Sequence, residues 1–571
     1  MPSIIERYRS LDYQLPKTYL SWDLFGAGLE NLGRDSKAVT LPLRDPNPDE
    51  LLLRVDALGL CFSDTKLILA GPKHPRITGR DLVNNPTVAG HEAALTVAKV
   101  GSNWKNKFSL GQRFIIQADI KVDGVQKAFG YVQRGAMAQY TYVDQNVLSV
   151  DNVCYLLPLK DTTGYIEAAL VEPWACVEGA YGIVERTAPV SGGRALVVFA
   201  SPDAKADFSG VYTTPPKSLT VLGHHGQDLS TFGVKPNASQ PSATAAAVKA
   251  AAEANAGFND IFLVGNASAE LIEACDLALA ESGILCFLSD GPLSSKAKLD
   301  IGRVHYLLTR FVGSNQAAAR DAYGRNTRSE LKAGGRAWMV GAAGPMGQMH
   351  VQRALELANP PKKLFCTDLS EERMQYMLNR LQPLATRKGV EFVCLNVGGI
   401  SDLDQRLKDF TAGQGFDDIY IHAPVAPLAE HAANFLGDNS VLNIFAGVGI
   451  GTLANLPPDI FASHHTRLIG SSGSSMEDLR VTLEKVETGQ LATRMSLAAI
   501  GGIEATWNGI KGLKENRFPG KTGILPQIHG LDLAGMDALA KNYPEVGSKM
   551  EAGSIWTTAA ELELLERCLK L

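Results

Sequence analysis

Three short segments in the first third of the chain carry side chains that bind metal ions. Cys61 lies in the first segment, His91 and Glu92 in the second, and Glu172 in the third. A thiolate, an imidazole and one or two carboxylates suit Zn²⁺ at a site that keeps one position open for water or substrate. Each residue alone is more common as a structural group, so the interpretation depends on their joint occurrence. The sequence predicts one catalytic zinc site, with the choice between Glu92 and Glu172 left open.

A glycine-rich segment in the second half of the chain has the pattern of a dinucleotide-binding βαβ unit. A strand core at residues 337–340 runs into a glycine-rich turn, an amphipathic helix follows, and a strand at residues 363–367 ends at Asp368. The glycines let the backbone approach a pyrophosphate, and the helix N-terminus supplies N–H donors. Asp368 can accept hydrogen bonds from a ribose hydroxyl. A nicotinamide cofactor needs a group that polarises a carbonyl or acidifies an alcohol, which zinc does.

The elements around these motifs predict an α/β protein. Short strands expected at residues 51–58, 94–100, 113–117 and 139–143 form a compact β module around the first two metal-binding segments. Glu172 falls in a helical stretch. The βαβ pattern indicates a doubly wound parallel sheet.

Composition limits the possible partners. The 571 residues correspond to about three to four domain-sized units. The net charge of −5, without a basic cluster interleaved with aromatic residues, gives no support for nucleic-acid binding. No apolar run reaches the roughly 18 residues of a membrane span, and the first residues lack a signal-peptide core. Eight scattered cysteines suit reduced thiols, so we expect a cytoplasmic protein without a structural zinc site.

With these motifs, the chain resembles the zinc-dependent medium-chain alcohol and polyol dehydrogenases. The resemblance covers residues 45–185 and 331–526, and its short strings are most similar to the sorbose-1-phosphate reductase branch. It is carried by these segments: Cys61-Phe62-Ser63-Asp64, Gly90-His91-Glu92, Gly111-Gln112-Arg113, Gly135-Ala136-Met137-Ala138-Gln139-Tyr140, Glu172-Pro173, Ala343-Gly344-Pro345-Met346-Gly347 and Gly520-Lys521-Thr522-Gly523. The resemblance implies a GroES-like β-rich catalytic domain plus a Rossmann domain, and hydride transfer between a nicotinamide and a polyol, sugar or sugar phosphate.

The resemblance also implies residue roles. Cys61 and His91 would hold zinc with Glu92 or Glu172, Asp64 would orient His91, and Ser63 would pass a proton outward. The expected catalytic residues are Ser63, Asp64 and Lys66, with the proton passing from Ser63 toward Lys66 or solvent. The expected cofactor-binding residues are Ala342, Gly344, Pro345, Met346, Gly347, Asp368, Arg373, Phe445 and Gly447. Asp368 favours NAD over NADP, because a carboxylate would repel a 2′-phosphate.

Three departures from the family pattern matter. The segment of residues 117–135 has no cysteine where a structural zinc lobe would need four. Lys66 replaces the histidine that often ends the proton relay. Ala342 replaces the first glycine of the fingerprint, so Gly344 and Gly347, with help from Gly341, must allow the approach of phosphate.

An internal repeat accounts for about 145 residues that the family pattern lacks. The matching segments are 192–198 with 334–340, 258–261 with 416–419, 282–285 with 439–442 and 309–314 with 466–471. The last three pairs have offsets of 157 or 158 residues, which favours a second Rossmann-like copy inserted before the first. The inserted copy has Ala200-Ser201-Pro202-Asp203 in place of the glycine-rich turn, and Gly223-His224-His225 in place of the acid. We therefore expect it to bind no cofactor.

The predicted domains are a catalytic domain (1–185), the inserted copy (186–330), the NAD-binding domain (331–498), a return to the catalytic domain (499–530) and a helical tail (531–571). In the copy, residues 239–256 are expected to form one helix. In the tail, residues 531–540 and 558–569 are expected to be amphipathic helices, the second with solvated Glu561, Glu563 and Glu566. We expect the edge strands at 310–314 and 467–471 to lie side by side as an intramolecular pseudo-dimer; an altered homo-oligomer or an active-site lid are the alternatives.

Two other functions remain possible from the sequence. One is a zinc-free reductase of an activated double bond, and the other is a non-catalytic NAD-binding assembly protein. The basic loop at residues 73–80 could receive a sugar phosphate or could be a solvated surface loop.

Overall fold

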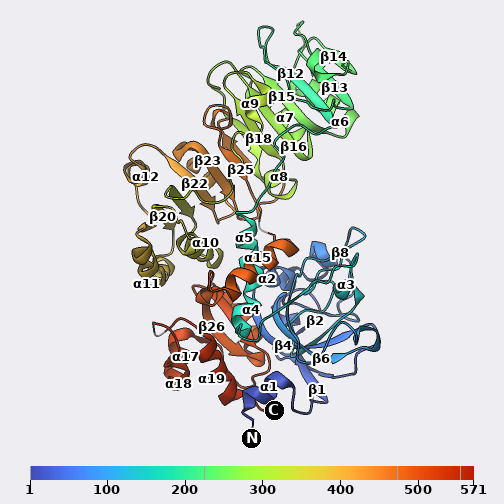
Figure 1. Ribbon diagram of the computed structural model, residues 1–571, viewed down its shortest axis with the longest axis vertical. Coiled ribbons are helices and arrows are strands. Elements are labelled where there is room, and N and C mark those ends of the chain that lie inside the picture. Colours follow the sequence, from blue (N-terminus) through green and yellow to red (C-terminus); the bar gives the residue numbers. More distant parts are fainter. Residues whose placement is uncertain (1, 224–225, 472, 553) are drawn as a thin grey trace. The chain divides into compact units, whose positions relative to one another are not determined.

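A computed structural model describes residues 2–223, 226–471, 473–552 and 554–571. The chain forms two compact units (Figure 1). The first comprises residues 1–178 and 473–571, and the second comprises residues 179–472. The chain thus returns to the first unit at Gly473, whereas the sequence placed this return at residue 499. His224 and His225, expected in place of the acid of the inserted copy, lie outside the described residues.

The first unit is built on an eight-stranded sheet. Its central strand is β4 (Leu51–Leu60), a continuous and fully buried run in which Arg54 and Asp56 neutralise each other at 2.7 Å. The four strands predicted from the sequence are confirmed with small shifts in their ends. The sheet order is β11 (Leu156–Pro158), β7 (Arg113–Ile116), β6 (Glu92–Val100), β4, β27 (Lys521–Leu525), β26 (Leu497–Gly502) and β28 (Ala534–Gly535), with β10 (Tyr140–Val143) also paired to β4.

Three helices of the first unit bear on the metal-binding segments. Helix α2 (Phe62–Ala70) starts directly after β4, with Cys61 as its N-cap. Helices α4 (Tyr165–Ala169) and α5 (Val171–Gly179) follow one another, and α5 carries Glu172 in its first turn. Each metal-binding segment therefore sits where a strand or helix begins or ends, which fixes its backbone.

The C-terminal segment packs on the first unit through charged side chains. Helix α19 (Thr558–Cys568) confirms the second predicted tail helix, while the first is shorter than expected and occupies Met536–Asn542 (α17). The expectation that Glu561 is solvated is wrong, because only 1% of it is exposed. Its carboxylate accepts the N–H groups of Tyr165 and Ile166 at 2.5 and 2.8 Å. Glu561 thereby satisfies free donors at the start of α4.

The second unit contains two six-stranded parallel sheets with the same strand order. In both, the strands run 3-2-1-4-5-6 in their order along the chain, the arrangement of a dinucleotide-binding fold. The first sheet is β14 (Ala238–Gln240), β13 (Ser218–Leu222), β12 (Arg194–Phe199), β15 (Phe258–Val264), β16 (Leu279–Leu288) and β18 (Arg310–Ser314). The second is β21 (Glu391–Asn396), β20 (Lys363–Asp368), β19 (Arg336–Val340), β22 (Phe416–Ile421), β23 (Leu436–Ile444) and β25 (Arg467–Ile469).

The two sheets differ after their first strand. In the second sheet, α10 (Pro345–Glu356) connects β19 to β20. In the first sheet, none of the described residues between β12 and β13 is helical, and an aromatic cluster packs there around Phe208, Phe232 and Phe262. The alanine-rich stretch forms α6 (Ala245–Asn255), but residues 238–240 belong to β14 rather than to the predicted helix.

The same buried ion pair recurs in both sheets. Arg186 binds Asp260 at 2.6 Å in the first sheet, and Arg328 binds Asp418 in the second. Both aspartates are fully buried and also accept a backbone N–H from the segment before the first strand. The two sheets therefore share a buried ion pair as well as a strand order.

The two sheets meet in a symmetric way. Strands β17 (Ala297–Asp300) and β24 (Leu453–Leu456) pair antiparallel, and Lys298 stands opposite Asn455. β18 and β25 lie side by side (Figure 1). Their arginines, Arg310 and Arg467, each place Nε 3.0 Å from one carboxylate oxygen of Glu185.

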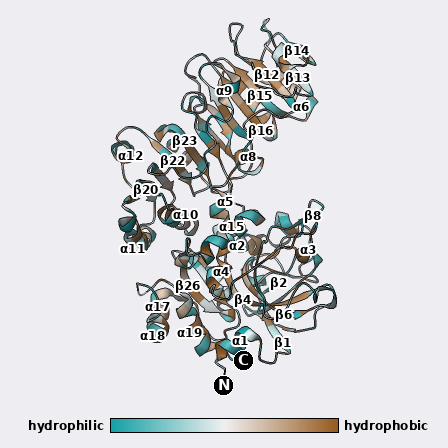
Figure 2. Ribbon diagram, in the orientation of Figure 1, coloured by the Kyte–Doolittle hydropathy of each residue, from teal (hydrophilic) through white to brown (hydrophobic). Residues whose placement is uncertain are grey.

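Glycines at the junction show the same symmetry. A Cβ on Gly313 would lie 2.8 Å from Ala462, and one on Gly470 would lie 3.4 Å from His305. Gly313 corresponds to Gly470, and His305 to Ala462, at an offset of 157 residues. Each glycine therefore packs against the counterpart of the residue that the other glycine contacts. One apolar core continues through both sheets, and their central strands are mostly brown in Figure 2.

No helix in the described part of the chain is long and apolar enough to cross a membrane.

Candidate metal centre and cofactor edge

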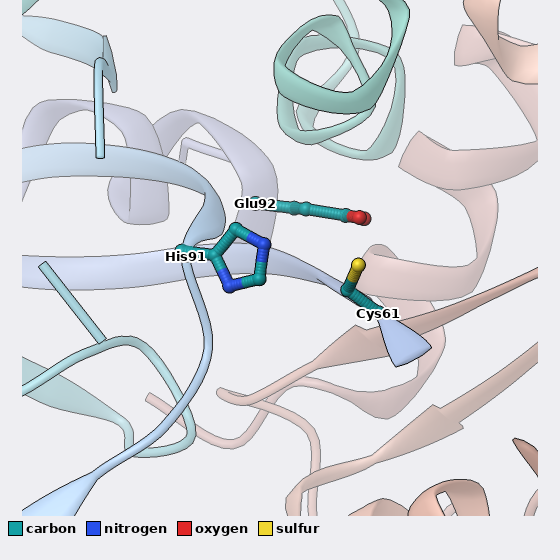
Figure 3. A group of neighbouring side chains, drawn as sticks. All are labelled: Cys61, His91 and Glu92. Atoms are coloured by element: carbon teal, nitrogen blue, oxygen red, sulfur yellow. The ribbon is translucent and has the colours of Figure 1, made fainter. Parts of the chain in front are cut away.

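Cys61, His91 and Glu92 converge in the first unit. One possible ligand atom from each lies within 4.8 Å of the others, and Figure 3 shows the three side chains pointing toward one another. Cys61 follows β4, and Glu92 begins the neighbouring strand β6. Because these strands pair antiparallel, with Gly59 opposite Glu92, the end of one meets the start of the other. The structure thus brings the sulfur of Cys61 close to the nitrogen and oxygen donors of His91 and Glu92, which follow it by about 30 residues.

Asp64 holds the two metal-binding loops together. Its buried carboxylate accepts the backbone N–H of Cys61 at 3.0 Å and of Gly90 at 3.1 Å. The same carboxylate lies 3.1 Å from His91 Nδ1. Burial disfavours a charged imidazole, but Asp64 outweighs it, so the pKa of His91 is raised well above its usual value. In the neutral ring that would bind a metal, Nδ1 donates to Asp64 and the Nε2 lone pair lies on the side of Ser63.

Glu92 has one occupied and one unpartnered oxygen. Lys521 Nζ lies 2.5 Å from Glu92 Oε1 and donates to the carbonyl of Leu60 at 3.0 Å. Glu92 Oε2 is buried and has no hydrogen-bond partner among the residues that the structure describes. A Cβ on Gly59 would lie 2.1 Å from this oxygen, so only glycine leaves room for it. An unpaired carboxylate oxygen in the interior is costly unless a cation completes it.

Sequence reasoning missed Lys521 as a site residue. Lys521 entered the sequence-based prediction only as part of the segment Gly520-Lys521-Thr522-Gly523 that carries the family resemblance. The signal that could have found it is the pairing of β27 with β4, which brings Thr522 opposite Leu60.

Ser63 lies beside the convergent group, whereas Lys66 does not reach it. Ser63 Oγ donates to Cys61 Sγ at 3.0 Å and lies 3.4 Å from His91 Nε2. Lys66 is exposed, and its ammonium lies 5.7 Å from the ring centre of Phe62. No hydrogen bond joins Lys66 to Ser63 among the described residues. The expected relay from Ser63 to Lys66 is therefore not formed in this conformation.

Glu172 lies near the three convergent residues but outside their group. Burial raises the pKa of Glu172 to about 7; His91 lowers it, and Glu92 and Asp119 raise it further. Cys176, one turn further along α5, has a pKa raised well above its usual value by burial and by Glu172. The geometry therefore favours Glu92 over Glu172 as the oxygen donor in this conformation.

Tyr131 and Arg76 form a wall beside His91 that the sequence did not reveal as a unit. The ring centre of Tyr131 lies 5.8 Å from that of His91, and the Arg76 guanidinium carbon lies 4.6 Å from the Tyr131 ring centre. Arg76 also pairs with Asp119 at 2.5 Å. Tyr131 and Asp119 carried no motif, which explains why sequence reasoning did not find them.

The glycine-rich turn in the second unit lies where the sequence predicts it. Gly341, with φ of +73°, follows β19, and Pro345 starts α10. A Cβ on Gly347 would lie 2.6 Å from the carbonyl oxygen of Gly341, so this glycine is required for packing of the helix on the turn. Beside Gly344 nothing lies within 4 Å of such a Cβ. Ala342 is buried, and the first helical turn contains Met346.

Asp368 closes the turn from the neighbouring strand. It ends β20, and its carboxylate accepts the N–H groups of Ala343 at 2.9 Å, Leu369 at 2.7 Å and Ser370 at 3.1 Å. Asp368 therefore has a structural role in addition to any contact with a ribose. Arg373 lies in the first turn of α11 (Glu371–Lys388).

The last two predicted cofactor residues follow β23. The ring of Phe445 is buried 4.3 Å from that of His350, centre to centre, whereas Gly447 is exposed. The backbone after β23, rather than the Phe445 ring, is thus the part that a ligand could reach.

Comparison with known proteins agrees with this fold. Residues 47–152 match the alcohol dehydrogenase GroES-like domain. A solved structure from Sinorhizobium meliloti 1021, designated an alcohol dehydrogenase, superposes with a TM-score of 0.50 at 13% identity, covering 90% of this chain and 100% of that chain. These similarities support a relation of this chain to the medium-chain alcohol and polyol dehydrogenases.

Two curated proteins are similar to this chain over about half of its length or more. Mannitol-1-phosphate 5-dehydrogenase of Aliivibrio fischeri is 23% identical over 547 residues, covering 93% of this chain and 95% of the relative. L-sorbose 1-phosphate reductase of Klebsiella pneumoniae is 28% identical over 309 residues, covering 49% of this chain and 73% of the relative.

Proposed function

We propose that this protein is a zinc- and nicotinamide-dependent oxidoreductase that interconverts a secondary alcohol and a ketone in a polyol, sugar or sugar phosphate. The observation that carries the proposal is the convergence of Cys61, His91 and Glu92 in a chain that also holds the glycine-rich turn beside Asp368. The match to the alcohol dehydrogenase GroES-like domain supports the reaction class, and the names of the two relatives support polyols and sugars as substrates.

The three convergent residues fit a zinc ion. Cysteine, histidine and glutamate are ordinary zinc ligands, and three protein ligands with one open position are typical of catalytic sites. Glu92 Oε2 has no hydrogen-bond partner among the described residues and could bind a cation, and a neutral His91 with Nδ1 donating to Asp64 would offer its Nε2 lone pair to the same ion. When bound, zinc would supply Lewis acidity that polarises a carbonyl or lowers the pKa of an alcohol.

The residues around the three ligands have separable tasks. Asp64 holds the tautomer and orientation of His91. Lys521 occupies Glu92 Oε1 and leaves Oε2 as the donor atom. Ser63 Oγ, close to both Cys61 and His91, is placed to exchange a proton with a substrate hydroxyl. Since no hydrogen bond joins Lys66 to Ser63 among the described residues, solvent would accept the proton.

The cofactor would bind at the carboxyl edge of the second sheet of the second unit. The N-terminus of α10 offers N–H groups to a pyrophosphate. Asp368 still has acceptor capacity after its three backbone bonds, because an ionised carboxylate has about four lone-pair sites. Its charge favours NAD over NADP. None of the described residues 200–217, at the matching place of the first sheet, is helical, which supports one cofactor per chain.

The deciding experiment combines metal analysis with a substrate panel. We expect about one zinc per chain and NADH formation with at least one polyol or polyol phosphate. Cys61→Ala should lose both metal and turnover, whereas Cys154→Ala, at a cysteine distant from the convergent group in the sequence, should keep both. Turnover of an activated alkene without metal would instead identify a zinc-free reductase. NAD binding without turnover on the whole panel would identify an assembly protein.

We infer in addition that the two sheets of the second unit form an intramolecular pseudo-dimer. The support is the register of β17 and β24. Residues 298 and 455 are separated by the repeat offset of 157, so Lys298 pairs with its own counterpart and a pseudo-twofold axis passes between them. Arg310 and Arg467 are also counterparts, and each contacts a different carboxylate oxygen of Glu185 at the same distance, as the pseudo-twofold axis requires.

A cysteine pair tests the pseudo-dimer. Lys298→Cys combined with Asn455→Cys should form a disulfide within one chain, because opposite residues of antiparallel strands bring their Cα atoms to about 4.5–5.5 Å. An equimolar mixture of the two single variants should give no covalent dimer. A covalent dimer from that mixture would mean that the sheets of different chains pair, and the pseudo-dimer would be rejected.

A further inference from the structure

The basic loop beside the metal centre contains two arginines with opposite roles. Arg80 is saturated by protein oxygens: its guanidinium donates to the carbonyls of Asn85, Val132 and Pro86 at 2.7 to 3.0 Å, and to further acceptors at longer range. Arg80 therefore fastens the loop. Arg76, only four residues earlier, has no carbonyl acceptor among the described contacts.

Arg76 is held in place by one charge and one ring. Its guanidinium pairs with Asp119 at 2.5 Å and lies over Tyr131, and 32% of its side chain remains exposed. An arginine offers five N–H donors in a planar fork, so the single contact with Asp119 leaves donors open. Cation–π stacking fixes the plane of the fork without using those donors.

The position of Arg76 relative to the metal centre suits a particular ligand length. Tyr131 is shared, since its ring lies next to both Arg76 and His91. The two ring distances together place the guanidinium carbon at most 10.4 Å from the centre of the His91 ring. An extended carbon chain advances roughly 1.2 Å per bond. In a polyol 1-phosphate, the phosphorus therefore lies about 4 Å from carbon 2 and about 7 Å from carbon 5. A five- or six-carbon polyol phosphate can therefore reach both groups.

We propose that Arg76 is the anion-recognition residue of this enzyme, that it binds the terminal phosphate of an acyclic polyol phosphate, and that Asp119 is its resting counter-ion. This proposal rests on the proposed oxidoreductase function and deepens it by naming the substrate class. Arginine binds phosphate through two parallel charge-assisted hydrogen bonds, a geometry that a free polyol hydroxyl cannot use. Asp119, itself 40% exposed in its side chain, balances the charge of Arg76 when no phosphate is bound.

Asp119 makes the preference adjustable. When Asp119 and a phosphate both bind the Arg76 guanidinium, their negative charges repel each other. The phosphate must therefore displace Asp119 or bind the other edge of the guanidinium. Removing this charge should strengthen phosphate binding, whereas removing Arg76 should weaken it. A solvated surface arginine would show neither effect.

The test compares a free polyol with its terminal phosphate on the zinc-loaded protein. Hydrogen bonds to charged groups contribute about 1.5–3 kcal/mol, which corresponds to a factor of about 10–150. Arg76→Gln should lower the ratio of kcat/KM for phosphate over free polyol by about this factor, mainly through KM, and Asp119→Asn should raise it. Arg76→Lys should restore part of the ratio, because it keeps the charge but loses the fork.

Two controls separate the possible failures. Arg80→Gln should lower the melting temperature without inverting the phosphate preference, since its donors serve the loop. Thermal-shift titration with inorganic phosphate should show weaker binding to Arg76→Gln than to the parent protein, independently of turnover. An unchanged ratio and unchanged phosphate binding in an active Arg76→Gln protein would overturn the subsite alone. A parent protein without turnover on any polyol would instead reject the proposed function, and phosphate binding would still report on Arg76.

Discussion

Lys521 and Glu92 form a buried ion pair at 2.5 Å, in which the lysine is 5% exposed and the glutamate is not exposed. One carboxylate oxygen is paired with the ammonium, and the other has no hydrogen-bond partner among the described residues, in a side chain that converges with Cys61 and His91. The pair thus decides which oxygen of Glu92 is presented to a metal.

The first prediction concerns Lys521→Met. Removing one partner of a buried pair costs about 3–5 kcal/mol, because the other charge stays behind. We expect this loss in chelator-treated protein and a smaller loss after zinc is added, since the metal supplies a positive charge near Glu92. Chemical denaturation with and without zinc measures both. Lys511→Met, at an exposed pair of 3.9 Å with Glu515, should change stability by less than about 1 kcal/mol. Equal losses in the two metal states would contradict the interpretation.

The second prediction concerns Asp64→Asn. The asparagine can still occupy the space but presents an N–H where His91 Nδ1 now donates, which favours the wrong tautomer. We expect zinc affinity to fall about 10- to 100-fold, measured by competition with a chromogenic chelator. Asp81→Asn, at an exposed turn aspartate, is the control and should leave the affinity unaltered. Unchanged affinity in Asp64→Asn would remove Asp64 from its assigned role.

The third prediction concerns the C-terminal helix. Glu561→Ala leaves the N–H groups of Tyr165 and Ile166 without acceptors, and we expect a loss of about 1–3 kcal/mol in unfolding free energy. Glu563→Ala, on the same helix but engaged only with exposed Lys549 and Arg567, should lose less than about 1 kcal/mol. Similar losses for the two variants would indicate that only helix propensity matters.

The fourth prediction concerns pH. Burial lowers the pKa of His422 to about 4, and it lowers that of the adjacent His350 well below the usual value. A histidine with a depressed folded-state pKa binds its proton more readily in the unfolded chain, so stability is lost as pH falls from about 6.5 toward 4. For His422 alone, the loss between pH 7 and pH 5 should be about 2 kcal/mol.

The His422 contribution can be isolated by substitution. His422→Gln removes the titrating ring, and its unfolding free energy should change less between pH 7 and pH 5 than that of the parent protein. Replacement of the exposed His464 by glutamine should leave the pH dependence close to that of the parent. A parent-like slope in His422→Gln would mean that other groups cause the acid sensitivity.

The sequence predicted those parts of the fold and site that local pattern controls. Strand β19 and the turn from Gly341 to Gly347 followed from an apolar run and glycine spacing. The parts it missed depend on contacts between distant segments. Lys521 meets Glu92 only because β27 pairs with β4, and Glu561 is buried only because α19 lies on the start of α4. An acidic residue in an amphipathic helix looks solvated until the partner helix is known.

Two site expectations illustrate the same limit. Glu92 and Glu172 could not be separated from sequence, because both are carboxylates beside metal-binding motifs; strand register brings Glu92 to Cys61. Lys66 is within one helical turn of Ser63, yet its side chain turns outward to Phe62. Spacing along a helix restricts where a long flexible side chain can go but does not select its rotamer.

The pairing of β17 with β24 has a consequence for biosynthesis. The central pair, Lys298 and Asn455, is 157 residues apart in the sequence. The first sheet therefore leaves the ribosome before β24 and β25, and its edge strand β18 stays uncovered until β25 has been made. At translation speeds of about 5–20 residues per second, this delay is roughly 8–30 seconds. An open strand edge is prone to aggregation during such an interval. The nascent chain is therefore expected to depend on chaperones at this stage, and faster elongation between the two repeats should raise its soluble yield.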